Sequence, residues 1–305
     1  MDLAHVRTLQ EIVKHGGFSR AARVLHRSQP AVSHHIRLLE AELGVSLVER
    51  VGKRAFPTAA GHIFLTHAAR ALQELDMARQ AVQQVRGRVA GRVRLGTGAT
   101  AATYLLPSVL GPLRRRYPDL ELAITTGNSP DIVASVGDNV LDLGLVTLPA
   151  SGRHLAVFPF AVDALVGIAP PTPEWVRRRS LDPEELGRHP MICYERGGTI
   201  RAVIDEWFRR AGVIPRIAME LGNAEAIKRL VEAGLGVGVT SAITVKSEVR
   251  LGSLIALPLA PRLARRLAIV SRRDKPVSPA LQALVGALET FRLRAARMLA
   301  PARAR

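Results

Sequence analysis

The spacing of apolar residues changes at Gly91, and this change constrains the fold more than any other feature of the sequence. Before Gly91, apolar residues recur at the helical intervals of three and four. After it, short apolar runs alternate with amphipathic helical stretches. The first pattern predicts a helical unit and the second an α/β unit. A chain of 305 residues is long enough for two or three such units.

The charge of the chain favours an anionic partner. There are 43 Lys and Arg against 26 Asp and Glu, a formal net charge of +17, which favours nucleic acid ahead of a membrane surface. The single cysteine, Cys193, excludes an intramolecular disulfide framework and suits a reducing compartment; we interpret it as a buried structural thiol. No apolar run approaches the roughly 18 residues of a membrane span, and the amino end does not resemble a signal peptide. These features predict a cytoplasmic protein with no membrane partner.

Residues 28–44, SQPAVSHHIRLLEAELG, are predicted to form one helix. Ser28 is placed to cap it, a proline in the first turn leaves no donor unsatisfied, and Gly44 ends it. Four apolar residues at spacings of four, three and four make one stripe, namely Val32, Ile36, Leu39 and Leu43. The residues on the other side are Gln29, Pro30, Ser33, His34 and Arg37.

A shorter helical stretch, residues 19–26, precedes this helix across a tight turn. Two short helices so joined, the second with a polar face at its N-terminal end, describe a helix-turn-helix. Its second helix enters the major groove of double-stranded DNA, where Ser, Gln and Arg side chains can read base edges. An ordinary amphipathic surface helix is the alternative. The residues predicted to contact DNA from this helix are Ser28, Gln29, Pro30, Ser33, His34 and Arg37.

A basic hairpin is predicted to follow. Arg50, Lys53 and Arg54 surround Gly52, and such a turn can lie along a phosphate backbone as a wing. Phosphate contacts fix position and supply salt-dependent affinity rather than choice of sequence.

The stretch FSRAARVLHRSQPAVSHHIRLLEAELGVSLVER, followed by a basic turn and PTAAG, resembles the N-terminal signature of LysR-type transcriptional regulators. The resemblance runs from about residue 3 to 61. Val48 stands where that family usually has an aromatic residue, and Phe56-Pro57 replaces a hydrophobic residue before Thr58. The resemblance to this family implies a winged helix-turn-helix over residues 1–58.

Residues 59–90 are predicted to form a long linker helix. The stretch 59–89 contains no proline and carries an imperfect heptad seam: Ile63, His67, Arg70/Ala71, Glu74/Leu75, Ala78, Val82 and Val85. A helix of this length with so little core of its own needs a partner. The resemblance implies the same helix of a second subunit, in a homodimer or homotetramer; packing on its own domain is the alternative.

Beyond Gly91 we expect parallel α/β sheets, with ligands beyond the carboxyl ends of the strands against helix N-termini. The predicted strands are RVRLGTG, LELAITTG, LDLGLVT, PMICYE, RIAMEL, GVGVTS and RLAIVSR. The segment Gly96-Thr-Gly-Ala-Thr-Ala101 fits a loose dinucleotide fingerprint. That site also needs an acid at the end of the second strand, whereas LELAITTG ends in Thr-Thr-Gly. We therefore expect no nicotinamide or flavin cofactor.

Hydroxyl and amide residues at the starts of several helices favour a small polar ligand instead. The resemblance implies an effector-binding domain over residues 91–293, built like periplasmic binding proteins. Its subdomain I would span about 91–163 and 267–293, and subdomain II about 164–266. The predicted effector-binding residues are Gly98, Thr100, Asn128, Ser129, Gly198, Thr199 and Asn223. Thr100, Ser129 and Thr199 are each as readily simple helix caps, and we expect Lys228 to be a solvated helix residue.

Catalytic and metal motifs are missing from the sequence: it has no Gly-x-Ser-x-Gly, no His-Glu-x-x-His and no cysteine–histidine cluster. We therefore expect no enzyme, and a basic C-terminal tail over residues 294–305. The sequence predicts a DNA-binding transcriptional regulator controlled by a small anionic or carboxylate-bearing effector, with RNA polymerase a candidate partner. The alternatives are a metabolite-binding protein whose N-terminal helices serve assembly only, and a nicotinamide-dependent enzyme.

Overall fold

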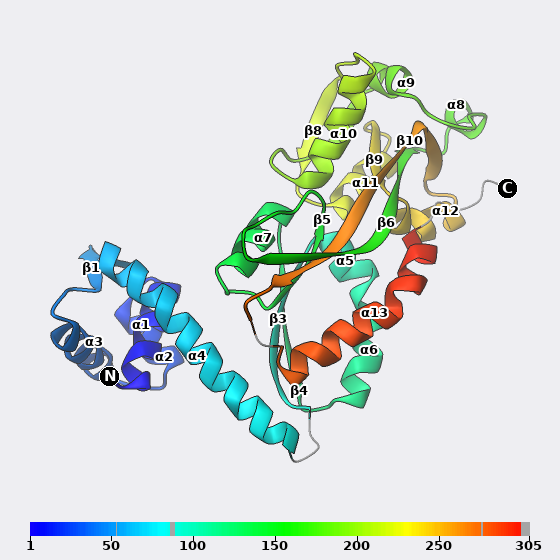
Figure 1. Cartoon of the computed structure of the whole chain (residues 1–305). Helices are drawn as coiled ribbons and strands as arrows, with labels where there is room; N and C mark the ends of the chain where they lie inside the picture. The colour runs from blue at the N-terminus through cyan, green and yellow to red at the C-terminus, as the bar shows by residue number, and fades with distance from the viewer. Residues whose placement is uncertain (53, 86–88, 276, 300–305) are drawn as a thin grey trace. The chain divides into compact units, whose positions relative to one another are not determined.

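The computed structural model describes the chain except for residues 53, 86–88, 276 and 300–305 (Figure 1). The chain forms two compact units, Met1–Arg79 and Gln80–Arg305. In the described part of the chain, no helix has both the length and the apolar character that crossing a membrane requires.

The first unit holds three helices, a two-stranded hairpin and most of a long fourth helix. Their bounds are α1 Leu3–His15, α2 Phe18–Val24, α3 Gln29–Leu43, β1 Val48–Val51, β2 Arg54–Pro57 and α4 Ala59–Val85. As predicted, Ser28 caps α3 and Gly44 ends it with a left-handed backbone conformation at φ 68°. Val32, Ile36 and Leu39 are buried in the core shared by these elements. Leu43 is 36% exposed, because it lies in the last turn, beyond the part of α3 that the core covers.

The long helix α4 contributes only part of its surface to this unit. Ala68 and Leu72 are buried against the core of the three-helix unit. Ile63, Leu75 and Val82, all on the predicted seam, are 66%, 42% and 66% exposed. Large aliphatic side chains that are exposed in the single chain indicate a surface that a partner can cover.

The second unit is built on one eight-stranded sheet in the order β4-β3-β5-β10-β6-β9-β7-β8. The strands are β3 Gly91–Thr97, β4 Leu120–Thr126, β5 Leu143–Thr147, β6 Leu155–Ala169, β7 Met191–Tyr194, β8 Ile217–Leu221, β9 Val237–Ser241 and β10 Ile255–Arg272. Strands β3, β4 and β5 are parallel, as are β7, β8 and β9. The two central strands, β6 and β10, run antiparallel to their neighbours.

The expectation of wholly parallel sheets was therefore wrong at the centre. Strand β6 and the first part of β10 were not predicted, because prolines and charged residues interrupt them; Pro159 and Asp163 lie in β6, and Pro258 and Pro261 in β10. Their hydrophobic pattern therefore does not show a short, continuous apolar run.

Three clusters of buried apolar residues lie along this sheet. The helices are α5 Ala99–Tyr104, α6 Leu106–Arg116, α7 Ser129–Gly137, α8 Pro173–Val176, α9 Pro183–Arg188, α10 Thr199–Arg210, α11 Ala224–Glu232, α12 Lys246–Leu251 and α13 Pro279–Leu299, with a 3-10 turn at Ala242–Val245. On β6 the core changes between Phe160 and Leu165, and on β10 between Leu263 and Leu267. The unit thus consists of two α/β subdomains that β6 and β10 join (Figure 1).

The predicted basic tail needs correction. Helix α13 continues to Leu299, and Ala295 and Leu299 are fully buried against the core of the first subdomain. Residues 294–299 are therefore held by apolar packing despite their arginines, and residues 300–305 lie outside the described part of the chain.

Candidate functional site

The polar side of α3 is open to solvent. Gln29, Pro30, His34 and Arg37 are exposed, and Ser33 is half-buried. The Ser28 hydroxyl accepts a hydrogen bond from the Ala31 amide, at 3.3 Å. Gln29 Nε2 donates to Ser33 Oγ at 2.9 Å, one turn further along. The predicted residues therefore form one polar face at the N-terminal end of the helix.

The hairpin extends this face. Strands β1 and β2 pair antiparallel, and Gly52 makes the turn at φ 62°, a left-handed conformation that favours glycine. Arg50 lies 4.1 Å from the ring centroid of Phe18, and its Nη2 is 3.4 Å from Ser33 Oγ. Arg54 is exposed, whereas Lys53 lies outside the described residues. Arg50 therefore lies against the polar face of α3 rather than projecting freely.

His35, on α3, contacts α1. His35 Nδ1 is 2.9 Å from Thr8 Oγ1, whose own proton goes to the Ala4 carbonyl at 2.7 Å. His35 Nδ1 must therefore be the donor. Burial, followed by the nearby charge of His5, lowers the pKa of His35 below its usual 6.5. The neutral imidazole is thus the form that fits between α1 and α3.

A cavity of about 260 Å³ lies at the carboxyl ends of the strands, between the two subdomains. All seven residues predicted to bind an effector line it: Gly98, Thr100, Asn128, Ser129, Gly198, Thr199 and Asn223. Gly98, Asn128, Gly198 and Asn223 are the N-caps of α5, α7, α10 and α11, so four helix N-termini meet at the cavity. A Cβ on Gly198 would lie 3.1 Å from Asn128 Oδ1, so glycine permits the two walls to approach each other closely.

Two of these side chains also have structural duties. Ser129 Oγ accepts from the Thr147 amide at 2.9 Å, and Asn223 Oδ1 caps the Ala226 amide at 2.9 Å. Asn223 therefore both caps α11 and lines the cavity.

Sequence reasoning missed two charged side chains of the cavity, Arg265 and Glu195. Arg265 Nε donates to the fully buried Asp163 at 2.7 Å, and Nη1 donates to Thr147 Oγ1 at 3.3 Å. Asp163 in turn accepts from Ser241 Oγ at 2.5 Å. Arg265 lies in a segment of β10 that is rich in alanine and arginine, so nothing local in the sequence marks it.

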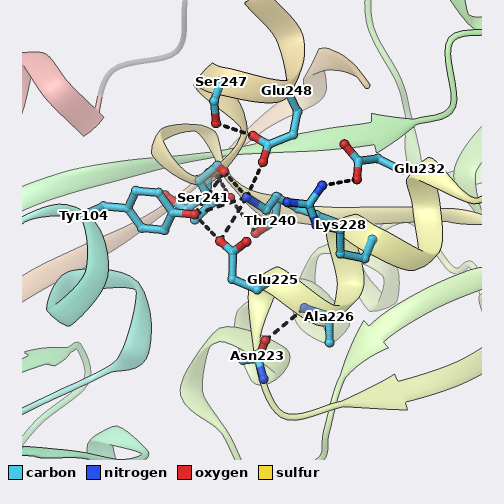
Figure 2. Close-up of polar contacts among 12 residues, drawn as sticks. Tyr104, Asn223, Glu225, Ala226, Lys228, Glu232, Thr240, Ser241, Ser247 and Glu248 are labelled. Carbon is cyan, nitrogen blue, oxygen red and sulfur yellow. Dashed lines mark hydrogen bonds and ion pairs between the residues drawn. The ribbon is translucent and has the colours of Figure 1, made fainter. Parts of the chain in front are cut away.

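Lys228 was expected to be solvated and is instead 1% exposed, because its side chain enters a cluster of polar groups from α5, the 3-10 turn and α12 (Figure 2). Its Nζ lies 2.7 Å from Glu248 and 2.9 Å from Glu225, and it donates to Tyr104 Oη at 3.2 Å. Burial alone would lower the pKa of Lys228, but hydrogen bonds to Glu248, Glu225 and Tyr104 outweigh it and raise the pKa. The Tyr104 hydroxyl also donates to Glu225.

This Lys228 network bridges the subdomains beside the cavity. Tyr104 lies at the end of α5 in the first subdomain, whereas Glu225 and Lys228 lie on α11 in the second. Asn223, which caps α11 and lines the cavity, lies at the start of the helix that carries Glu225 and Lys228 (Figure 2). The network therefore fixes α11, and with it one wall of the cavity, relative to α5.

Two family models match the chain. The model described as "LysR substrate binding domain" matches residues 86–292, and the one described as "Bacterial regulatory helix-turn-helix protein, lysR family" matches residues 3–62. The chain belongs to the LysR family of regulators.

Relatives along nearly the whole chain agree. An uncharacterized HTH-type transcriptional regulator, YeiE of Escherichia coli K12, is 34% identical over 92% of this chain and 94% of that protein. The RuBisCO operon transcriptional regulator of Allochromatium vinosum is 31% identical over 98% of both chains. A full-length OxyR variant from Pseudomonas aeruginosa has a similar structure, with a TM-score of 0.76 and 25% identity over 96% of this chain and 95% of that one.

This LysR-family chain is a regulator and not an enzyme.

Gly96, in the segment that resembles a dinucleotide fingerprint, has a packing role that explains the glycine at this position. A Cβ there would lie 2.5 Å from Leu141 Cδ1 and 2.8 Å from Ile132 Cγ2, so glycine lets α7 and the following loop pack onto β3. Within the described residues, no group of three or more His, Cys, Asp or Glu side chains is arranged to hold a metal ion.

The one cysteine of this regulator is shielded. Cys193 lies in β7 and is 5% exposed. Burial raises its pKa to about 11, so little thiolate exists at neutral pH. The prediction of a buried structural thiol agrees with these observations.

Proposed function

We propose that this LysR-family regulator binds double-stranded DNA as a homo-oligomer, and that a small anionic or carboxylate-bearing effector bound in the cavity controls it. The observation that carries the proposal is the convergence of four helix N-termini and Arg265 on one cavity, in a chain that also presents an exposed polar face on α3.

The DNA-binding part rests on the exposed face of α3. Gln29, Ser33, His34 and Arg37 would read base edges, with Ser28 and Pro30 shaping the helix entry. Arg54, and the Lys53 and Arg50 positions around the turn, would bind phosphates. The cytoplasm is the compartment where such a protein meets DNA, and contact with RNA polymerase remains a prediction.

The assembly part rests on α4. Ile63, Leu75 and Val82 lie along one seam and are exposed, so pairing with the same helix of a second subunit would bury them. Such pairing would fix the separation of two recognition helices and hence the spacing of two half-sites.

The effector part rests on electrostatics. Each helix N-terminus carries a partial positive charge and free N–H groups, and α7, α10 and α11 direct theirs toward the cavity. Arg265 adds a guanidinium on the cavity wall, paired through Nε with Asp163. An effector that binds one arrangement of the subdomains more tightly than another would shift the equilibrium between them, and with it the placement of the paired DNA-binding units.

A mobility-shift assay tests the proposal. Full-length protein is incubated with the DNA upstream of its own gene and with bulk DNA at about 150 mM salt. We expect preferential binding to a specific fragment, and Arg37→Ala should lower that preference. If no genomic fragment is bound more tightly than bulk DNA, the chain is instead a metabolite-binding protein whose N-terminal helices serve assembly.

A further inference from the structure

The charges on the cavity wall identify the class of effector more narrowly. Among the described residues that line the cavity, Arg265 and Glu195 carry the two charged side chains. The others are glycine, alanine, threonine, serine, asparagine, tyrosine and branched aliphatic residues. A ligand in this cavity therefore meets one cationic and one anionic side chain in a mostly neutral, polar setting.

Arg265 is held in place with one edge left available. Its side chain is 10% exposed, Asp163 and Thr147 engage Nε and Nη1, and its Nη2 donates to none of the described residues. The Asp163 carboxylate is itself shared with Ser241, so it does not saturate the guanidinium. A planar guanidinium fixed in this way suits a ligand carboxylate.

Glu195 has no comparable partner. It is exposed, and no described side chain donates to its carboxylate; the adjacent Arg196 pairs with Glu220 at 3.3 Å instead. The carboxylate lies against Gly222, with Oε1 3.5 Å from where a Cβ of that residue would be. A ligand that fills the cavity displaces water from Glu195, and an unpaired carboxylate that loses its hydration is costly. A ligand that carries a cation offsets this cost.

We propose that the effector is a small zwitterion of the amino-acid type. Its carboxylate binds Arg265 and the N-termini of α7 and α10, and its protonated amine binds Glu195. The partial positive charges of the helix N-termini balance the Arg265–Asp163 pair and Glu195, so a ligand with no net charge fits the site better than a dianion. The inference rests on the proposed effector cavity, whose volume of about 260 Å³ restricts the ligand to a small molecule.

Matched ligands test the proposal. Thermal unfolding of the full chain is followed with about 10 mM of each free α-amino acid, β-alanine and 4-aminobutyrate. Each is compared with the carboxylate that lacks the amine and the amine that lacks the carboxylate. A second panel contains sulfate, phosphate and dicarboxylates. We expect at least one amino acid to raise the unfolding temperature by several degrees, and neither of its matched compounds to do so.

Variants then assign the groups by calorimetric titration of the stabilising amino acid. Glu195→Gln should weaken its binding at least tenfold and remove the advantage over the deaminated acid. Arg265→Lys keeps the charge beside Asp163 but loses the guanidinium edge. It should weaken the binding of both the amino acid and the deaminated acid. Glu184→Gln, on α9 and 72% exposed, lies outside the cavity wall and should leave affinity unchanged.

The outcomes separate this inference from the proposed function. If only deaminated acids, dicarboxylates or inorganic anions stabilise the protein, or if Glu195→Gln leaves amino-acid affinity unchanged, the zwitterion is refuted and the anionic effector stands. If no compound of either panel stabilises the protein, both the zwitterion and the anionic effector are contradicted.

Discussion

The DNA-binding face and the effector cavity use charge in opposite ways. On α3 and the hairpin, Arg37 and Arg54 lie in solvent, so each retains its hydration until a partner arrives. In the effector-binding unit, Arg265 and Lys228 are almost completely buried; Asp163, 102 residues away, holds Arg265, and Glu225 and Glu248 hold Lys228. An exposed charge can be added or removed at little cost to folding, whereas a buried one is tied to its partners. Substitutions on the DNA-binding face should therefore change DNA binding with little effect on stability. Substitutions of the buried cations in the effector-binding unit should change stability as well as binding.

The largest effect is expected from Lys228→Met. It leaves Glu248, 6% exposed, buried without its cation, so the free energy of unfolding should fall by about 3–5 kcal/mol. Chemical denaturation followed by circular dichroism measures this. Arg229→Gln removes an arginine that is 67% exposed and pairs with Glu232 on the same helix, and should cost less than about 1 kcal/mol. A double variant, Lys228→Met with Glu248→Leu, should recover most of the loss; equal losses in the single and double variants would contradict the comparison.

A second effect concerns the exposed apolar residues of the first unit. Ile63→Asp places a charge on the α4 seam and should weaken self-association by at least about 2 kcal/mol, roughly thirtyfold. Light scattering after size-exclusion chromatography measures the mass. His62→Asp introduces the same charge at an exposed position outside the seam and should leave the mass unchanged. A monomeric wild-type protein at micromolar concentration would remove the basis of this prediction.

A third, smaller effect distinguishes base contacts from phosphate contacts on the exposed DNA-binding face. Arg37→Ala should lower discrimination between specific and bulk DNA by about 1–3 kcal/mol, because a base contact is lost. Arg54→Ala should weaken all DNA similarly and reduce the slope of log affinity against log salt by about one. Fluorescence anisotropy at several salt concentrations measures both. The reverse pattern would mean that α3 does not lie in the major groove.

The smallest effect tests the buried group of the first unit. Because the pKa of His35 is lowered in the folded state, the unfolded chain binds its proton first as pH falls. The contribution of His35 is therefore complete above pH 6.5 and declines as pH drops below it. Hydrogen exchange of the α1 and α3 amides in the full chain should accelerate between about pH 7.5 and 5.5, after correction for intrinsic rates. His35→Gln should remove this acceleration, and His34→Gln, at the exposed neighbouring position, should retain it.

The same contrast explains what could be predicted from the sequence. The α3 face and the cavity residues Asn128, Gly198 and Asn223 were predictable, because caps and helical stripes are set by neighbours within a few positions. Arg265 was not, since its partner Asp163 is 102 residues away, and Lys228 was not, since Tyr104 is 124 residues away. The amphipathic pattern of α11 predicts a solvated basic residue with Glu225 three positions before it, and only the fold brings Glu248 and Tyr104 to Lys228.

The shielding of Cys193 makes this regulator well suited to distance measurements. As the chain's single cysteine, with a pKa raised to about 11, it reacts slowly with thiol reagents at neutral pH. Cysteines introduced by Val140→Cys and Ile214→Cys, at positions 59% and 94% exposed on different subdomains, would take up spin labels far faster. Cys193 then does not have to be replaced before labelling. Opening or closing of the two subdomains on ligand binding would be measured as a change in the distance between the two spin labels.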